Sequence, residues 1–234
     1  MTHLTLADAI LLVALGFIAP AYSYYAGTRI ARGRLGKRMR AYARTMLSWW
    51  LIASIMLFLW SRLGRPLASL GIAVSLDARS IAGAALCVVA IVVTTRQVSI
   101  VSRIPPESLA QLRSGFGRTL AVLPRSPAEY RLFLAVAVTA GICEELLYRG
   151  YFLAATSSFL TLDGAIAVGA LAFGAGHAYQ GARGMVRTSL AGILFSLLYV
   201  FTGSLLWPIV LHVTIDIHGG TIGYYLLREE QRRS

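Results

Sequence analysis

The sequence predicts an all-α membrane protein, a polytopic transmembrane helical bundle of about seven spans. Three observations lead to this fold class: 57% of the 234 residues are hydrophobic, only 14% are charged, and long apolar runs recur along the chain. Soluble domains carry about 25% charged residues, so this composition excludes an ordinary soluble globule. The mean hydropathy of +0.67 agrees with that interpretation.

Apolar segments of roughly 20 residues, the length that crosses about 30 Å of hydrocarbon, define the expected spans. Nothing resembling the basic start of a signal peptide precedes Leu4, so the first run is expected to stay as a membrane helix. Pro66–Leu76 is apolar but too brief to cross, which favours an interfacial or re-entrant piece, and the sixth run is short, so six to eight spans fit the pattern. The seven expected helices lie at residues 4–26, 46–63, 80–100, 132–157, 164–180, 188–203 and 205–226.

The 22 basic residues lie almost entirely between these segments and indicate the orientation. Eighteen of them fall in the connections 27–45, 96–131 and 183–187 and at the C-terminus. The positive-inside rule therefore predicts an outside N-terminus and a cytoplasmic C-terminus. The net charge of +12 then reflects topology and attraction to anionic lipids rather than binding of nucleic acid. The opposite connections hold only Arg62, Arg65 and Arg79.

One long polar connection, at residues 101–128, divides the chain. It contains Pro105, Pro106 and Pro124, which favour turns, and it separates three N-terminal helices from four C-terminal ones. We therefore expect an N-terminal three-helix membrane region with basic cytoplasmic loops at residues 1–123 and a four-helix membrane core at residues 124–234.

Ionisable side chains at membrane depth cost about 2.5–3.5 kcal/mol each on insertion scales, so they indicate function. The three N-terminal spans are nearly free of them, and we expect Asp8 to be solvated near the outer surface. The four C-terminal spans carry Glu144, Glu145, Arg149, His177, His212, Asp216 and His218.

The spacing of the charged residues along the fourth span distinguishes those expected to hold the bundle together from the one expected to take part in the chemistry. Glu145 and Arg149 stand four residues apart on one helix face and are expected to form an ion pair that holds the bundle together. Glu144 is rotated by about 100° from its neighbour and has no cation three or four residues later. Glu144 therefore needs a partner on another helix or a water-filled cavity, and it is the expected chemical residue.

Three other residues can lie within roughly 10 Å of the midplane beside Glu144, at about 1.5 Å of rise per residue. His177 follows Phe173 by one turn, and the small residues 174–176 let another backbone approach closely. His212 and Asp216 point the same way, as metal ligands or a hydrogen-bonded pair would. His218 lies on another face and is interpreted as a packing residue or a helix irregularity.

This set of residues favours peptide hydrolysis inside the membrane. A carboxylate with a histidine can take a proton from water, and further polar groups can bind the oxyanion formed when that water attacks a carbonyl carbon. The sequence has no HExxH motif, no serine in a Gly-x-Ser-Gly setting and no second deep aspartate for an aspartyl dyad. An ion-coupled transporter is the less favoured alternative, because no matching pair of Gly/Pro-broken helices is present.

Three motifs on successive helices resemble those of the CPBP family, which includes type II CAAX prenyl endopeptidases and bacterial bacteriocin-processing and immunity proteins. The resemblance covers residues 124–226 and implies that the C-terminal core is the catalytic part. It implies that Glu144 and His177 activate water, that His212 and Asp216 stabilise the oxyanion, and that the other motif residues support the site. The motifs are Glu144-Glu145-x-x-x-Arg149, Phe173-x-x-x-His177 and His212-x-x-x-Asp216.

The resemblance leaves the cofactor open between none and a divalent cation such as zinc. In the second case Glu144, His177, His212 and Asp216 would be the ligands. Many family members carry asparagine where this chain has Asp216, whose carboxyl donates a hydrogen bond only when protonated. Otherwise Asp216 orients His212 or binds a cation.

The implied activity is that of an intramembrane endopeptidase acting on a membrane-associated peptide or protein. The alternative is a non-catalytic membrane immunity or binding protein that keeps these residues as a structural network. An arginine-rich chain whose one lysine is Lys37 is typical of a GC-rich bacterial genome. This composition favours a multi-pass protein of a bacterial cell membrane and argues against a prenylated substrate.

Overall fold

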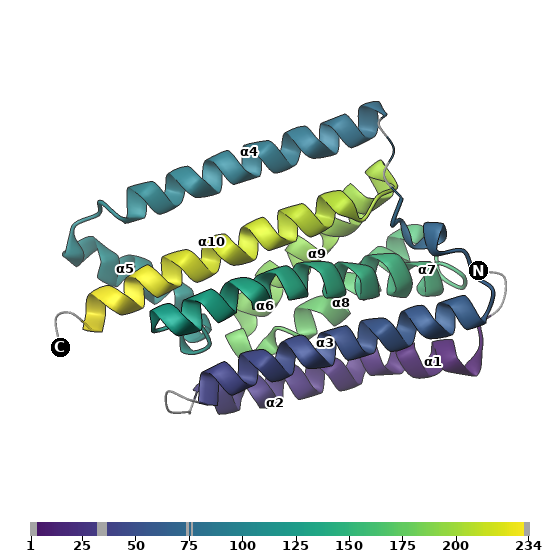
Figure 1. Ribbon diagram of the computed structural model, residues 1–234, viewed down its shortest axis with the longest axis horizontal. Coiled ribbons are helices and arrows are strands. Elements are labelled where there is room, and N and C mark those ends of the chain that lie inside the picture. The colour runs from purple at the N-terminus through teal and green to yellow at the C-terminus, as the bar shows by residue number, and fades with distance from the viewer. Residues whose placement is uncertain (1–3, 32–36, 74, 76, 232–234) are drawn as a thin grey trace.

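The computed structural model of the chain describes residues 4–31, 37–73, 75 and 77–231, and this part contains helices and turns but no strand. Seven long helical runs cross the bundle in alternating directions (Figure 1). Two of the runs contain a π-helical segment, η1 in the first and η4 in the fourth. The runs are α1–η1–α2 (Leu6–Val13, Ala14–Ile18, Ala19–Ala31), α3 (Lys37–Arg62), α4 (Ala78–Val101), α6–η4–α7 (Pro127–Glu145, Leu146–Phe152, Leu153–Thr156), α8 (Leu162–Ala175), α9 (Ala182–Thr202) and α10 (Leu206–Gln231).

Each run overlaps one of the seven predicted apolar segments. In the described part of the chain, four helices are long and apolar enough to cross a membrane: Leu6–Ala31, Arg38–Arg62, Ala78–Val101 and Ala182–Thr202. The runs 127–156 and 206–231, which hold most of the predicted site residues, are not among them. The all-α membrane bundle predicted from the sequence is therefore the observed fold class.

Helix α6 lies at the centre of the bundle. It packs against α3 on one side and α10 on the other, and α4 covers the outer side of α10 (Figure 1). Helices α8 and α9 pack closely against each other behind α6. This order brings residues of α6, α9 and α10 side by side, although they are far apart in the sequence.

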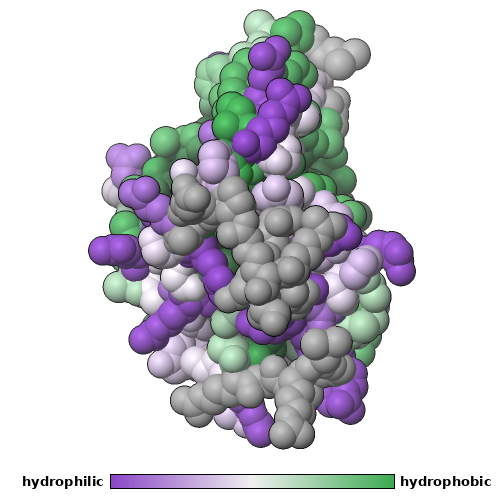
Figure 2. All heavy atoms as spheres, turned by 90° about the vertical axis from the view of Figure 1, so that its left-hand side faces the viewer, coloured by the Kyte–Doolittle hydropathy of each residue, from purple (hydrophilic) through white to green (hydrophobic). Residues whose placement is uncertain are grey.

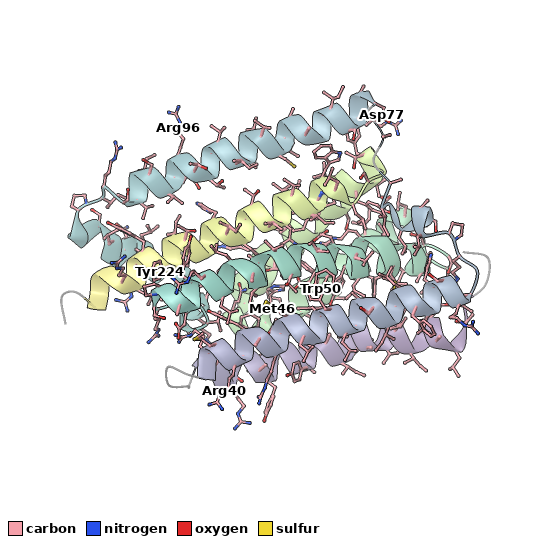
Figure 3. All side chains as sticks on the ribbon, in the orientation of Figure 1. Arg40, Met46, Trp50, Asp77, Arg96 and Tyr224 are labelled. Atoms are coloured by element: carbon pink, nitrogen blue, oxygen red, sulfur yellow. The ribbon has the colours of Figure 1, made fainter. Side chains whose placement is uncertain are left out.

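The basic connections lie at one end of the bundle. The end of α2, the start of α3, the end of α4 and the C-terminal end of α10 all lie at the left of Figure 1. Figure 2 looks onto this end, where hydrophilic side chains are spread between the apolar helices. Arg40 and Arg96 project away from α3 and α4 there (Figure 3). Both of these arginines lie toward the end of the fold where the sequence places most of the basic residues.

The long polar connection expected at residues 101–128 contains helical segments of its own. This stretch forms α5 (Pro106–Phe116) and the 3₁₀ helix η3 (Gly117–Ala121). A proline at the first helical position is favourable, because its missing N–H would have no intrahelical partner there. Leu109 of α5 packs with Ile222 and Leu226 of α10, and this apolar contact folds α5 back onto the bundle.

Helix α3 begins well before the predicted residue 46, because Arg38 and Tyr42 in its first turns are buried and bind the segment that leads into α6. The Arg38 guanidinium is paired with Glu129, with Nη1 3.1 Å from Oε2, and donates through Nη2 to the carbonyl oxygen of Ala121 at 3.2 Å. The Tyr42 hydroxyl donates to the carbonyl oxygen of Val122. A buried, paired arginine extends the helix beyond its apolar stretch.

Asp8 is not solvated, contrary to the sequence-based expectation. Its side chain is only 2% exposed, and the Arg65 guanidinium donates to both of its carboxylate oxygens at 2.7 Å. The Tyr151 hydroxyl of η4 donates to the backbone carbonyl oxygen of Asp8 at 3.1 Å. The loop after α3 therefore turns back to meet α1, an arrangement that residue spacing does not reveal.

The apolar segment that follows Arg65 packs on the bundle. It forms the short 3₁₀ helix η2 (Leu67–Leu70), in which Leu70 is fully buried. Gly71 follows with a φ of 76°, and its carbonyl oxygen accepts a hydrogen bond from the N–H of Leu205 at 2.8 Å. Asp77 then caps α4 (Figure 3), and the hydrogen bond from the Ser80 N–H lowers the pKa of its carboxyl.

Candidate active site

The predicted site is built where α6 changes from α-helical to π-helical geometry. The change occurs directly after Glu144 and Glu145, and Arg149 lies inside the π-helical segment η4. Short π-helical segments within α-helices are frequent at functional sites. All three side chains are buried, with exposed fractions of 7%, 0% and 2% in chain order.

Glu145 joins three helices. Its Oε1 accepts hydrogen bonds from Arg149 Nη1 at 2.8 Å and from His212 Nδ1 of α10 at 2.7 Å. Arg149 Nη2 donates in turn to the carbonyl oxygen of Gly192 in α9 at 3.1 Å. The predicted Glu145–Arg149 ion pair is confirmed, and the bond from His212 makes Glu145 the residue that orients the His212 ring.

Aromatic rings enclose this network. The Arg149 guanidinium lies 4.3 Å from the ring centroid of Phe173 and 5.2 Å from that of Phe195, distances at which a cation is attracted to an aromatic face. The His212 ring stacks on Phe195 with centroids 5.0 Å apart, and it meets Phe173 edge-on at 5.8 Å. Phe173, predicted only as a supporting residue, therefore touches both the cation and the histidine.

Glu144 differs from Glu145 in having no partner among the residues that the structure describes. It is buried and borders a cavity, and its carboxyl makes no hydrogen bond or ion pair with any residue that the structure describes. A buried polar group without a partner costs free energy, so such groups in native proteins usually meet water or a ligand. The sequence-based expectation that Glu144 faces a water-filled cavity agrees with this position.

His177 lies in the turn after α8 rather than on the helix, where the apolar pattern had extended to residue 180. Its Nδ1 is 2.9 Å from the carbonyl oxygen of Phe173. Because a carbonyl oxygen only accepts, Nδ1 carries the proton, and in the neutral ring Nε2 has a free lone pair. Nε2 is thus the nitrogen able to accept a proton.

His212 and Asp216 lie on one face of α10, as their spacing predicts. The distance from His212 Nε2 to Asp216 Oδ2 is 3.6 Å, too long for a direct hydrogen bond. Since Nδ1 is bound to Glu145, Nε2 is the free nitrogen of His212. His212 is 4% exposed, whereas the Asp216 side chain is 36% exposed.

The four predicted catalytic residues, Glu144, His177, His212 and Asp216, border one cavity of about 870 Å³. Its remaining walls are mostly apolar and come from α1–α2, α3, α5, α6 and α9. His218 does not line it, and the buried Nε2 of His218 has no partner within the described residues. A long apolar cavity with a few converging polar groups is typical of a ligand or substrate site.

Close helix contacts set the spacing of these groups. A methyl group on Gly141 would overlap the Val213 side chain and come within 3.2 Å of the Val213 backbone nitrogen, so α6 and α10 approach closely beside Glu144 and His212. A methyl group on Gly174 would overlap the Ser189 hydroxyl of α9. The close approach predicted from the small residues 174–176 is confirmed at Gly174.

A divalent cation at this site was considered from the sequence. Within the described ranges, no three His, Cys, Asp or Glu side chains come together in a way that could hold a metal ion. The Nδ1 atoms of both histidines are held, that of His177 by a carbonyl oxygen and that of His212 by Glu145, so only Nε2 of each ring could ligate a cation. The arrangement of the described side chains does not fit a metal centre with three protein ligands.

Sequence reasoning missed two residues of the site. Tyr148, 4% exposed, borders the cavity one turn after Glu144, and its hydroxyl donates to the carbonyl oxygen of Leu15 in η1 at 3.1 Å. Its spacing of four from Glu144 could have indicated it. Phe195 lies on α9 outside every motif, and its contact with His212 comes from tertiary packing alone.

Residues 126–218 match the model of a family described as type II CAAX prenyl endopeptidase Rce1-like. The matched range contains all seven residues of the three motifs and ends before the last turns of α10. Comparison with curated proteins and with solved structures gave no significant match. The helices α1 to α5 lie outside the matched range, although they supply much of the cavity wall.

Proposed function

We propose that this chain, which belongs to the CPBP family through residues 126–218, is an intramembrane endopeptidase that hydrolyses a peptide bond of a membrane-associated peptide or protein. The chain is a multi-pass membrane protein with the core of a protease family. The proposal concerns the reaction and the residues that carry it.

The observation that carries the proposal is the contrast between two adjacent glutamates. Glu145 accepts hydrogen bonds from both Arg149 and His212, whereas Glu144 faces the cavity without a protein partner in the described chain. A purely structural network would use both carboxylates. A carboxylate left free at a cavity supports a role in chemistry, and it favours the peptidase over the non-catalytic alternative.

In the proposed reaction Glu144, assisted by His177 Nε2, takes a proton from a water molecule in the cavity. The hydroxide oxygen forms a bond to the carbonyl carbon of the peptide, and the carbonyl oxygen becomes an oxyanion. The carbon–nitrogen bond then breaks, and the proton held at Glu144 passes to the leaving amine. The products are a carboxylic acid and an amine, and no group of the enzyme is consumed.

His212 and Asp216 are proposed to bind the oxyanion. With Nδ1 held by Glu145, a protonated His212 ring directs its Nε2–H into the cavity, where it can donate to the developing charge. Asp216 donates only in its protonated form and otherwise holds the charge on His212. Glu145, Arg149 and Phe173 act by keeping His212 in this orientation.

We infer seven spans, with the N-terminus outside and the C-terminus in the cytoplasm, from the one-sided distribution of the arginines. The division at residue 123 is part of this proposal, with residues 1–123 supplying walls and basic loops and residues 124–234 supplying the catalytic groups. The setting is a bacterial cell membrane, whose anionic lipids would contact the basic end.

The topology can be tested by cysteine labelling on intact cells. Both native cysteines are buried, so an added cysteine provides the signal. We expect Ser69→Cys to react with a membrane-impermeant maleimide added outside, and Ser114→Cys to react only after the cells are opened. The reverse pattern would contradict the orientation.

The proposed function is tested by comparative mass spectrometry of membrane peptides from cells that carry either the wild-type protein or Glu144→Ala. We expect at least one new peptide terminus that disappears in the variant while the protein level stays constant. If every terminus is independent of Glu144, the enzyme assignment is wrong and the non-catalytic binding protein takes its place.

A further inference from the structure

The turn that carries His177 rests on a glycine of the N-terminal helix. Gly27 in α2 is buried, and a methyl group built on it would lie 2.6 Å from Cβ and 2.8 Å from Cδ2 of Tyr179. Distances under 3.0 Å are not seen for real Cβ atoms, and the Tyr179 Cβ cannot yield without its backbone. Only glycine at position 27 therefore accommodates Tyr179 where it lies.

Tyr179 is closely coupled to His177. Both belong to the turn between α8 and α9, in which the Gln180 N–H donates to the carbonyl oxygen of His177 at 2.9 Å. The Gly181 N–H donates to the carbonyl oxygen of Ala178 at 2.9 Å, and Gly181 itself has a φ of 88° before α9 begins. The two rings lie 6.0 Å apart. A displacement of Tyr179 in this short bonded turn moves the backbone that sets the position of His177.

The helix on the other side of this contact is itself fixed. At its outer end the Arg65–Asp8 ion pair and the hydroxyl of Tyr151 hold α1. In the middle, the Tyr148 hydroxyl binds the carbonyl oxygen of Leu15 in η1. These contacts hold α1 and η1, from which the run continues into α2 beside Tyr179, and the whole run lies outside the matched range 126–218.

We propose that Gly27 is a positioning residue for His177, acting through the packing of α2 against Tyr179. The close contact limits where the turn can lie, while the bond from Nδ1 to the Phe173 carbonyl oxygen fixes the ring and leaves Nε2 free. The catalytic role of His177 rests on the proposed function. The packing of its turn against α2 is independent of that function.

The test compares Gly27→Ala with Gly16→Ala in the full-length protein in detergent micelles. Gly16 belongs to the same helical run, and a methyl group there meets nothing closer than Phe152 Cε2 at 3.9 Å, so it is the matched control. The first readout is the rate at which diethyl pyrocarbonate modifies His177, followed by peptide mass spectrometry with His218 as the internal reference. We expect this rate to rise several-fold in Gly27→Ala and to stay at the wild-type value in Gly16→Ala.

The second readout is cleavage of the Glu144-dependent peptides found by mass spectrometry. Because a misplacement of about 1 Å can cost 10²-fold in rate, we expect kcat to fall about 10- to 100-fold in Gly27→Ala. KM should change less than kcat, since Gly27 lines the cavity but has no polar side chain that could bind substrate. A general loss of folded protein would instead lower the yield and leave the remaining molecules with a normal kcat.

Tyr179→Gly supplies the second arm of a double-mutant cycle. It removes the ring and the Cβ atom that a methyl group at position 27 would strike, so adding Gly27→Ala to it should change neither readout further. The single variant Tyr179→Gly also tests the idea if Gly27→Ala does not fold, because it frees the turn without any overlap and should raise the reactivity of His177. Wild-type reactivity of His177 in Gly27→Ala or in Tyr179→Gly would overturn the proposal.

The two hypotheses fail separately. If no cleavage depends on Glu144, the proposed function is wrong, but the reactivity of His177 still reports whether Gly27 positions it. If cleavage depends on Glu144 and Gly27→Ala is fully active with unchanged His177 reactivity, the proposed function stands and the role of Gly27 is rejected.

Discussion

Glu144→Gln is expected to lower the rate of peptide cleavage by a factor of about 10²–10⁴, the usual contribution of general acid–base catalysis. The amide keeps the size of the carboxyl but cannot take the proton from water. The free energy of unfolding should change by less than about 1 kcal/mol, because the described residues include no hydrogen-bond partner of Glu144 to lose. Initial rates on a Glu144-dependent peptide and urea unfolding in mixed micelles measure the two quantities.

Glu145→Gln, the same chemical change one residue later, is the matched control. It weakens charge-assisted hydrogen bonds to Arg149 and His212, so it should reduce stability as well as activity. Full cleavage by Glu144→Gln, at normal protein levels, would refute the catalytic role of this carboxylate. Equal losses of stability in both variants would mean that Glu144 is a structural residue.

Arg149→Met is expected to destabilise the fold by about 3–5 kcal/mol, because removing one partner of a buried pair leaves the other charge unpaired. Glu145 is fully buried and would keep only His212 as a partner on Oε1. The carbonyl oxygen of Gly192 and the faces of Phe173 and Phe195 would also lose their contacts with the guanidinium. Methionine fills much of the volume, so the loss reports the charge and hydrogen bonds.

Urea unfolding followed by tryptophan fluorescence checks this value. Arg96→Met on α4 is the control, since Arg96 projects away from the bundle (Figure 3) and its replacement should change stability by less than about 0.5 kcal/mol. A loss below about 1 kcal/mol in Arg149→Met would show that the buried pair contributes little and that Glu145 finds another partner.

The sequence alone predicts several parts of this protein well, because they depend on local patterns. Hydrophobic runs identify all seven long helices, since burial in a bilayer requires long apolar segments whatever their packing. The four-residue spacing of Glu145 and Arg149 predicts their ion pair, because neighbours at this distance share a helix face. The rotation of Glu144 away from them predicts that it faces a different environment.

Local patterns mislead where polar residues pair over long distances. The sequence predicts a solvated Asp8 near the surface, but this residue is buried against Arg65. Helix α3 begins earlier than its apolar stretch because Arg38 pairs with Glu129. In both cases the partner lies far along the chain. Hydropathy along the sequence cannot distinguish a buried, paired arginine from a solvated one.

The sequence by itself determined the fold class and the identity of the polar residues in the C-terminal core, because hydropathy and residue spacing act within one helix. Only the tertiary structure decided which carboxylate has hydrogen-bond partners, since His212 of α10 binds Oε1 of Glu145 and no described residue binds the carboxyl of Glu144. It also brought Phe195 onto His212 and Gly27 against Tyr179. These contacts join different helices, and their geometry is set by the close packing of backbones rather than by any pattern along one of them.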